Sequence, residues 1–92
     1  MKVTTKVFPM NNYGNFKASA SITIEDKICI TGIKLLEGKK GKFISFPQYQ
    51  KGGEYHDLVF PLNGELREKL TRLIVTEYEK TVKNAVTEND TI

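Results

Sequence analysis

The residues in this chain that could do chemistry are His56, Asp57 and the single cysteine, Cys29. Neighbouring side chains on a strand point to opposite faces, so His56 and Asp57 cannot bind one metal ion together. One histidine and one cysteine cannot supply the ligands of a zinc site. The sequence also lacks a serine in a nucleophile-elbow motif and a glycine-rich phosphate loop. We therefore expect no enzyme activity, no metal and no cofactor.

Asp57 and Cys29 are better explained by structural roles. Asp57 is expected to cap a turn or to accept hydrogen bonds from backbone amides beside Pro61. Cys29 is set among isoleucines and is expected to be a small buried hydrophobic residue. A lone cysteine excludes an internal disulfide and suits a reducing compartment. With no signal peptide and no apolar run near the ~18 residues of a membrane span, we expect a soluble cytoplasmic protein.

Positive charge in the middle of the chain indicates an anionic partner. Fourteen Lys and Arg residues stand against eleven Asp and Glu, which gives a net charge of +3. No acid lies between Gly38 and Gly53, a stretch that contains Lys39, Lys40, Lys42 and Lys51. Such a cluster is typical of contacts to nucleic-acid phosphates. It is equally typical of a lysine-rich hairpin turn that protects a sheet edge from pairing, and both interpretations stay open.

Three further residues follow Pro47 in an expected exposed loop, residues 48–54. Tyr49 could stack on an unpaired base, but an exposed tyrosine is more often a packing residue or a protein contact. Gln48 and Gln50 could hydrogen-bond adenine edges, which is a weak indication.

Alternating apolar residues predict five strands, at residues 2–8, 17–24, 27–37, 43–46 and 55–60. The apolar phase of the third strand changes at Gly32, which predicts a β-bulge and a curved sheet. Polar and glycine-rich turns are expected at residues 11–15, 25–26 and 38–41. In the second strand the apolar residues share one face, which we expect to be buried: Ala18, Ala20, Ile22 and Ile24.

After the last strand the apolar spacing becomes helical and predicts one amphipathic helix over residues 64–83. Asn63 is a good N-cap residue for it. Oppositely charged residues four apart are typical of a solvated helix face, and each pair is worth roughly 0.2–0.5 kcal/mol: Glu65–Lys69, Glu68–Arg72 and Glu79–Lys83. Arg67 stands outside these pairs and is the helix residue most available to a phosphate. Residues 85–92 are expected to form a polar tail beyond a single domain of residues 1–84.

Five strands followed by one helix predict an α+β fold. One helix cannot cover a five-stranded sheet, and a chain of 92 residues has a thin core. We therefore expect a homodimer in which apolar surface and sheet edges pair with a second copy.

The central and C-terminal motifs resemble the stage V sporulation protein G (SpoVG) family over residues 18–80. The similar stretches are Ile33–Gly38, Gly41–Pro47, Gly53–Asp57, Pro61–Asn63 and Arg67–Lys69. The resemblance implies a small homodimeric α+β protein whose strands pair across the subunit boundary. It also implies a cytoplasmic regulator of sporulation, septation or gene expression that binds double-stranded DNA.

The chain departs from the family after Pro47. The family has a basic run there, tied to DNA contact, whereas this chain has Gln48, Tyr49 and Gln50 and keeps only Lys51. His56 also stands where the family usually has arginine. These changes support an alternative function, a protein-binding adaptor of the division or sporulation machinery with little affinity for nucleic acid.

Overall fold

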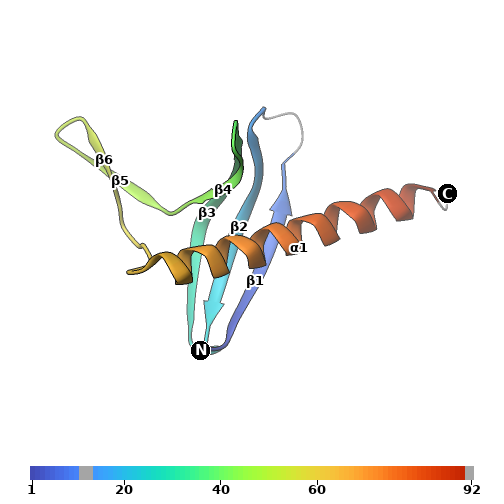
Figure 1. The fold of residues 1–92 in the computed structure, drawn as a ribbon, viewed down its shortest axis with the longest axis horizontal. Coiled ribbons are helices and arrows are strands. Elements are labelled where there is room, and N and C mark those ends of the chain that lie inside the picture. Colours follow the sequence, from blue (N-terminus) through green and yellow to red (C-terminus); the bar gives the residue numbers. More distant parts are fainter. Residues whose placement is uncertain (11–13, 91–92) are drawn as a thin grey trace.

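A computed structural model describes residues 1–10 and 14–90 of the chain. Its elements, in order, are β1 (Val3–Pro9), β2 (Phe16–Ile24), β3 (Ile28–Gly38), β4 (Gly41–Ser45), β5 (Gln48–Lys51), β6 (Glu54–Asp57) and α1 (Gly64–Asp90). Strands β1 to β4 form an antiparallel sheet in sequence order, and β5 and β6 form a second, two-stranded sheet. The helix crosses one face of the larger sheet (Figure 1). The predicted α+β architecture is confirmed.

Three details of the prediction are wrong. Residues 48–51 form strand β5 rather than part of a loop, and the strand predicted at residues 55–60 is β6, which ends at Asp57. The helix continues to Asp90, so residues 85–90 are helical in the described structure. The turn predicted at residues 11–15 lies partly outside the described residues. No helix in the described part of the chain is long and apolar enough to cross a membrane.

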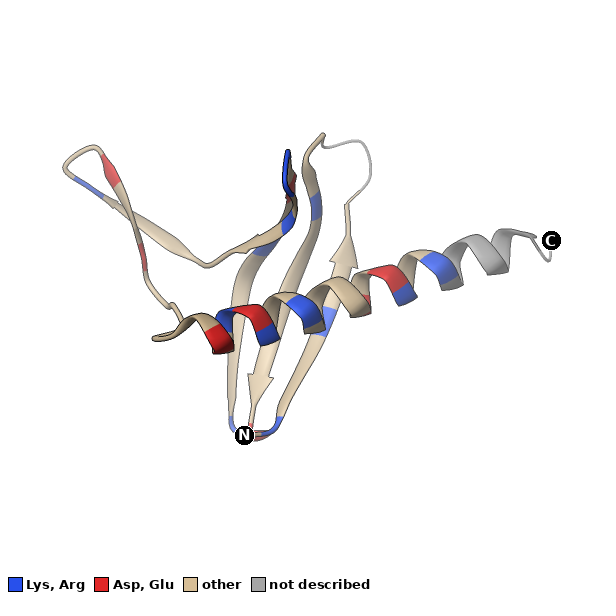
Figure 2. Cartoon of the chain, in the orientation of Figure 1, with Lys and Arg blue, Asp and Glu red and all other residues tan. Residues whose placement is uncertain are grey.

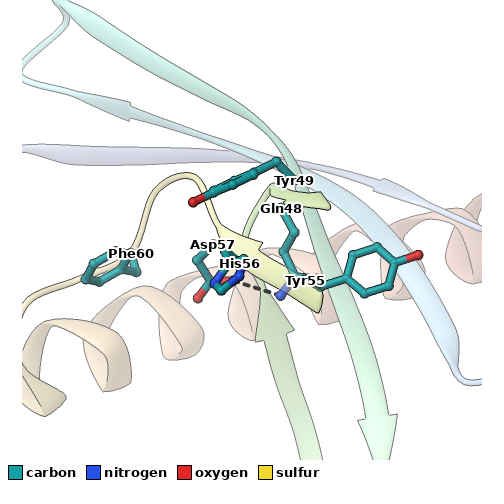
Figure 3. Close-up of a pocket in the computed structure, with 6 residues that line it drawn as sticks. All are labelled: Gln48, Tyr49, Tyr55, His56, Asp57 and Phe60. Atoms are coloured by element: carbon teal, nitrogen blue, oxygen red, sulfur yellow. Dashed lines mark hydrogen bonds between the residues drawn. The ribbon is translucent and has the colours of Figure 1, made fainter. Parts of the chain in front are cut away.

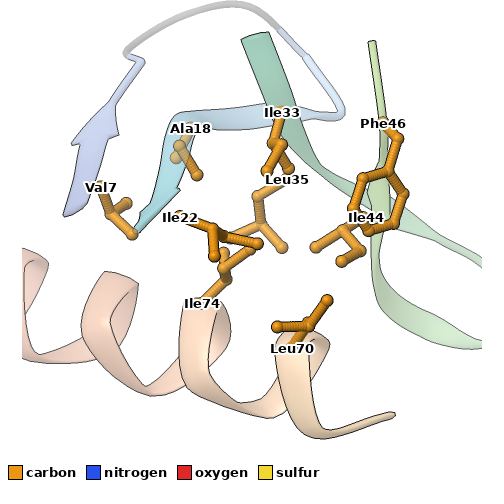
Figure 4. Packing of buried hydrophobic residues seen from close by; sticks show 10 residues of the cluster. Val7, Ala18, Ile22, Ile33, Leu35, Ile44, Phe46, Leu70 and Ile74 are labelled. Atoms are coloured by element: carbon orange, nitrogen blue, oxygen red, sulfur yellow. The ribbon is translucent and has the colours of Figure 1, made fainter. Parts of the chain in front are cut away.

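The core lies between the larger sheet and α1 (Figure 4). Alternation along β2 buries Ala18, Ala20 and Ile22, as predicted, while Ile24 packs partly buried at the margin. The helix contributes Leu70 and Ile74 from its apolar stripe. The remaining buried residues come from β1, β3 and β4 and from the residue that follows β4: Val7, Ile33, Leu35, Ile44 and Phe46. Removing this apolar surface from water is the main force that holds the helix on the sheet.

The predicted bulge occurs at Gly32. Ala20 pairs with Ile33 while Ile22 pairs with Ile30, so β3 carries one extra residue between the two pairs. Gly32 adopts a φ of 78°, which a side chain would strain. The bulge lets Ile30 and Ile33 face the same core despite their odd spacing.

Cys29 is exposed, which corrects the expectation that it is buried. It pairs with Thr23, whereas its neighbour Ile30 pairs with the buried Ile22. Because strand neighbours point to opposite faces, Cys29 lies on the face away from the helix.

The turn between β2 and β3 is strained and is fastened by the N-terminal segment. Glu25 and Asp26 both have a φ of 55°, the left-handed pair of a type I′ hairpin turn. The Lys2 backbone N–H donates to Glu25 Oε1 at 2.8 Å, and Lys2 Nζ lies 2.7 Å from Asp26 Oδ2. These contacts offset part of the cost of a left-handed conformation at residues other than glycine.

The helix begins with the predicted cap. Asn63 Oδ1 accepts a hydrogen bond of 2.8 Å from the Leu66 backbone N–H, one of the amides that has no partner within the helix. Leu66 itself packs partly buried against the core, so the cap fixes the point at which the apolar stripe begins.

Replacing this cap tests its contribution. Asn63→Ala is expected to lower the free energy of unfolding by about 0.5–2 kcal/mol, because the Leu66 amide loses its acceptor. Asn63→Asp keeps an acceptor oxygen and should retain most of the stability. Urea unfolding followed by circular dichroism measures both, and an equal loss in the two variants would contradict the capping role.

The β5–β6 hairpin, residues 48–57, projects from the body of the molecule and is called the arm below (Figure 1). Within the described structure, β5 and β6 make substantial contact with each other but with no other strand or helix. The Leu58 backbone N–H donates to the Pro47 carbonyl at 2.7 Å and closes the base of the arm. The arm is therefore held to the sheet only at its base.

Candidate nucleic-acid interface

Lys39 and Lys40 form the exposed turn between β3 and β4, at one end of the larger sheet (Figure 2). Neither lysine makes an ion pair within the described structure. Lys42, two residues on, is half-buried, and its Nζ lies 3.8 Å from Glu37 Oε1 on the neighbouring strand. The turn therefore presents two uncompensated positive charges, and Lys42 is partly neutralised.

Lys51 lies on the arm, away from the lysine turn (Figure 2). Its register partner is Glu54, so the arm carries opposite charges across its two strands. Glu54 Oε2 also lies 3.7 Å from Nε2 of His56. The lysines of the stretch between Gly38 and Gly53 thus lie in two separate groups, one at the turn and one on the arm. Glu37 and Glu54, from outside this stretch, lie next to Lys42 and Lys51.

Gln48, Tyr49 and Gln50 form most of β5, and all three are exposed. Gln48 Nε2 donates to Asp57 Oδ1 at 2.8 Å, so the hydrogen bond at Asp57 comes from a side chain rather than from the predicted backbone amides. The rings of Tyr49 and His56 lie 5.4 Å apart, tilted by 31°. This arrangement favours the packing role for Tyr49 and occupies the Gln48 amide.

Gln48, Tyr49 and His56 line an open groove on the arm (Figure 3). The other lining residues are Tyr55, Asp57 and Phe60. Tyr55 extends away from the Gln48–Asp57 hydrogen bond in this view. The groove is lined by three aromatic rings and three polar side chains, and aromatic residues are enriched where proteins contact one another.

Arg67 has a structural partner. Its guanidinium carbon lies 5.4 Å from the centroid of the Phe46 ring, and Phe46 is buried at the edge of the core. The contact is a cation–π interaction that fixes the first turn of α1 against the end of β4. The three ion pairs predicted along the helix are not formed within 4.0 Å in the described structure. They therefore do not contribute to the packing of the helix on the sheet.

Comparison with known proteins identifies the family. The sequence model of the SpoVG family matches residues 1–80, which includes the first strand that the sequence resemblance left out. The protein belongs to the SpoVG family. Proteins named "Putative septation protein SpoVG" share its sequence: 37% identity over 86 residues in Caldanaerobacter subterraneus (91% of this chain, 94% of the relative) and 35% over 86 residues in Agathobacter rectalis (91% and 99%). The protein of that name from Clostridium perfringens is 42% identical over 72 residues, which are 77% of this chain and 79% of the relative.

Membership in the SpoVG family associates the chain with septation and sporulation.

This SpoVG protein has a second basic surface, which the sequence patterns did not single out. Lys6, Lys17 and Lys34 all lie on strands whose apolar residues alternate toward the helix. The register of β1, β2 and β3 places Lys6 and Lys34 on the face away from the helix, and Lys17 precedes the buried Ala18 on the same β2 strand.

Proposed function

We propose that the protein acts in the cytoplasm as a homodimeric regulator of septation, sporulation or gene expression that binds double-stranded DNA. The observation that carries this proposal is an exposed apolar stretch in the connector that follows the arm, together with a lysine turn at the end of the larger sheet that makes no ion pair in the described structure. The exposed apolar surface supports association with a second copy of the chain, and the lysine turn supports binding of an anionic ligand.

The dimer is argued from the arm and the connector to α1, residues 58–63. Their large apolar side chains are exposed, with Tyr55 at 68%, Phe60 at 54% and Leu62 at 89%. Single exposed apolar residues are ordinary, but a run of them beside a projecting hairpin marks an interaction site: Leu58, Val59, Phe60 and Leu62. A second copy presents the same arm and connector, and a two-fold axis lets each pair cover the other's exposed apolar groups.

Duplex binding is argued from Lys39 and Lys40. A two-fold axis places two such turns on one dimer, which suits the two half-sites of a pseudo-palindromic duplex. Contacts from Lys39, Lys40, Lys42 and Lys51 to phosphates would supply affinity without sequence information. Specificity would come from DNA shape and from arm side chains such as Gln50, which has no partner in the described structure.

A salt titration tests the duplex proposal. The variant Lys39→Gln/Lys40→Gln is expected to weaken duplex binding at low salt and to reduce the slope of log affinity against log salt by about 0.9 for each phosphate that the variant no longer neutralises. Lys27→Gln/Lys80→Gln removes the same charge from other exposed positions and should change the slope little. Fluorescence anisotropy with a pool of labelled duplexes measures both, and absence of duplex binding even at low salt would contradict the proposal.

The adaptor function is the second candidate, because Glu37 pairs with Lys42 and Glu54 lies opposite Lys51 in the arm. It predicts a dimer that a heparin column does not retain near physiological salt and that captures a protein of the division or sporulation machinery. Retention on heparin together with duplex binding would decide against it.

A further inference from the structure

The face of the larger sheet opposite α1 carries aromatic and basic side chains. Partners in register on neighbouring strands share a face, so one row across the four strands is Phe8, Ser19, Lys34 and Ser45. The next row is Phe16, Leu36 and Phe43. Each of these residues alternates with a residue that packs toward the helix, as Lys34 does between the buried Ile33 and Leu35. We call this surface the open face.

The rings on the open face are accessible. Phe8 is 57% exposed and Phe43 is 47% exposed. A Cβ atom at Gly38 would lie 3.2 Å from the Phe43 ring, so the glycine leaves room for that ring on the surface of the sheet. Phe16 is half-buried, and Lys34 Nζ lies 5.7 Å from its ring centroid. With strands roughly 4.8 Å apart, the Phe16–Leu36–Phe43 row extends over about 10 Å.

The charge of the open face has one sign. Lys6 lies beside Ser21, and Lys17 lies between the outward Phe16 and the buried Ala18, at a register shift of β2. The one acid in strands β1 to β4 is Glu37, which pairs with Lys42 on the helix side of the sheet. The open face therefore combines rings with Lys6, Lys17 and Lys34 and has no carboxylate in its strands.

We propose that the open face binds single-stranded nucleic acid. Exposed rings on a four-stranded sheet can stack on bases whose faces are free, and lysines between the rings can contact the phosphates. In a duplex the base faces are covered by neighbouring base pairs, so these rings have no counterpart there. The occupant is thus a strand with unpaired bases, whatever its sequence.

A second copy of the chain does not suit this face. Two open faces placed together would bring their lysines into opposition with no acid to balance them, and like charges in register are destabilising. The apolar surface that suits self-association lies instead at Tyr55 of the arm and on the connector, residues 58–63. The inference concerns another surface and another ligand than the proposed function, so either can fail without the other.

Binding of labelled oligothymidine, followed by fluorescence anisotropy at low salt, tests the proposal. Phe8→Ala and Phe43→Ala are each expected to weaken this binding by about 5-fold to 150-fold, the range that corresponds to the loss of one stacked base. Both should leave duplex affinity within about twofold. Phe8→Tyr and Phe43→Tyr keep a ring and should bind nearly as the parent protein does. Ile28→Ala removes a side chain that is 60% exposed on the helix side of the same sheet, and it should have no effect.

Melting temperatures of the variants show whether each one is folded, and the tyrosine variants keep the test valid if an alanine variant is not. Three results would overturn the proposal. The first is no binding of oligothymidine by the parent protein at low salt. The second is binding that falls in a Lys6→Gln/Lys34→Gln variant but not in either alanine variant, because the surface would then be only electrostatic. The third is binding to anionic phospholipid vesicles as tight as the binding to oligothymidine, because an anionic surface without bases would then be a sufficient ligand.

Discussion

Replacing Tyr55 and Phe60 with serine is expected to convert the proposed dimer into a folded monomer. More than half of the surface of each side chain is exposed in the single chain, and neither side chain belongs to the core. An aromatic residue at the centre of an interface contributes about 2 kcal/mol or more, and a two-fold axis places each substitution in the interface twice. The double variant should therefore raise the dimer dissociation constant by at least about a thousandfold. Light scattering coupled to gel filtration measures the change in mass.

The matched control for this variant is Phe8→Ser. Phe8 is as exposed as Phe60 but lies on β1, far along the chain from the arm. The control should remain dimeric, and circular dichroism should show unchanged secondary structure in all three proteins. A parent protein that is monomeric at micromolar concentration would remove the basis of the homodimeric regulator, as would a Tyr55→Ser/Phe60→Ser variant that stays dimeric.

The second large effect is expected from Ile74→Ala. Ile74 is fully buried and, with Leu70, provides the buried part of the helix. Truncating such a side chain costs about 2–5 kcal/mol through lost transfer energy and the cavity left behind. Domains have a total stability of about 5–15 kcal/mol, so this change removes a large fraction of it. Urea unfolding at one fixed protein concentration measures the difference.

The control for Ile74→Ala is Ile28→Ala, which makes the same change at an exposed position. It should alter stability by no more than about 0.5 kcal/mol. Fixed concentration matters because the proposed dimerisation would add to the apparent stability of the folded chain. A loss below about 1 kcal/mol at Ile74 would show that the helix is not anchored by this side chain.

The sequence predicted correctly those features of the fold that depend on a short stretch of neighbouring residues. Alternation in β2, the phase change at Gly32 and the cap at Asn63 each depend on a few consecutive residues, and all three are confirmed. Strand β5 was missed because Gln48–Lys51 lacks apolar alternation, and its pairing with β6 supplies the hydrogen bonds that the pattern cannot show. The end of α1 was set too early because few apolar residues follow Val82, and helical periodicity is read from apolar residues.

The sequence showed which residue types the candidate site contains, but it did not show how they are arranged on the surface. The run of lysines was visible in the sequence, whereas the acids opposite Lys42 and Lys51 come from the register of the strands. Arg67 stood outside the helix ion pairs, yet its partner Phe46 lies far away in the sequence. Cys29 was misplaced because its isoleucine neighbours point to the other face. Charge balance and burial depend on contacts between distant segments, which a single sequence does not contain.

The hydrogen bond from Leu58 to Pro47 gives the arm a property of its own. Since the two ends of the hairpin leave the sheet side by side, residues can be inserted or deleted near Gly52 and Gly53 without altering the register of β1 to β4. The cost of a longer loop grows slowly with its length. Evolution can therefore diversify what this projection recognises while the framework beneath it stays constant, so lineages that share one scaffold can acquire different associations.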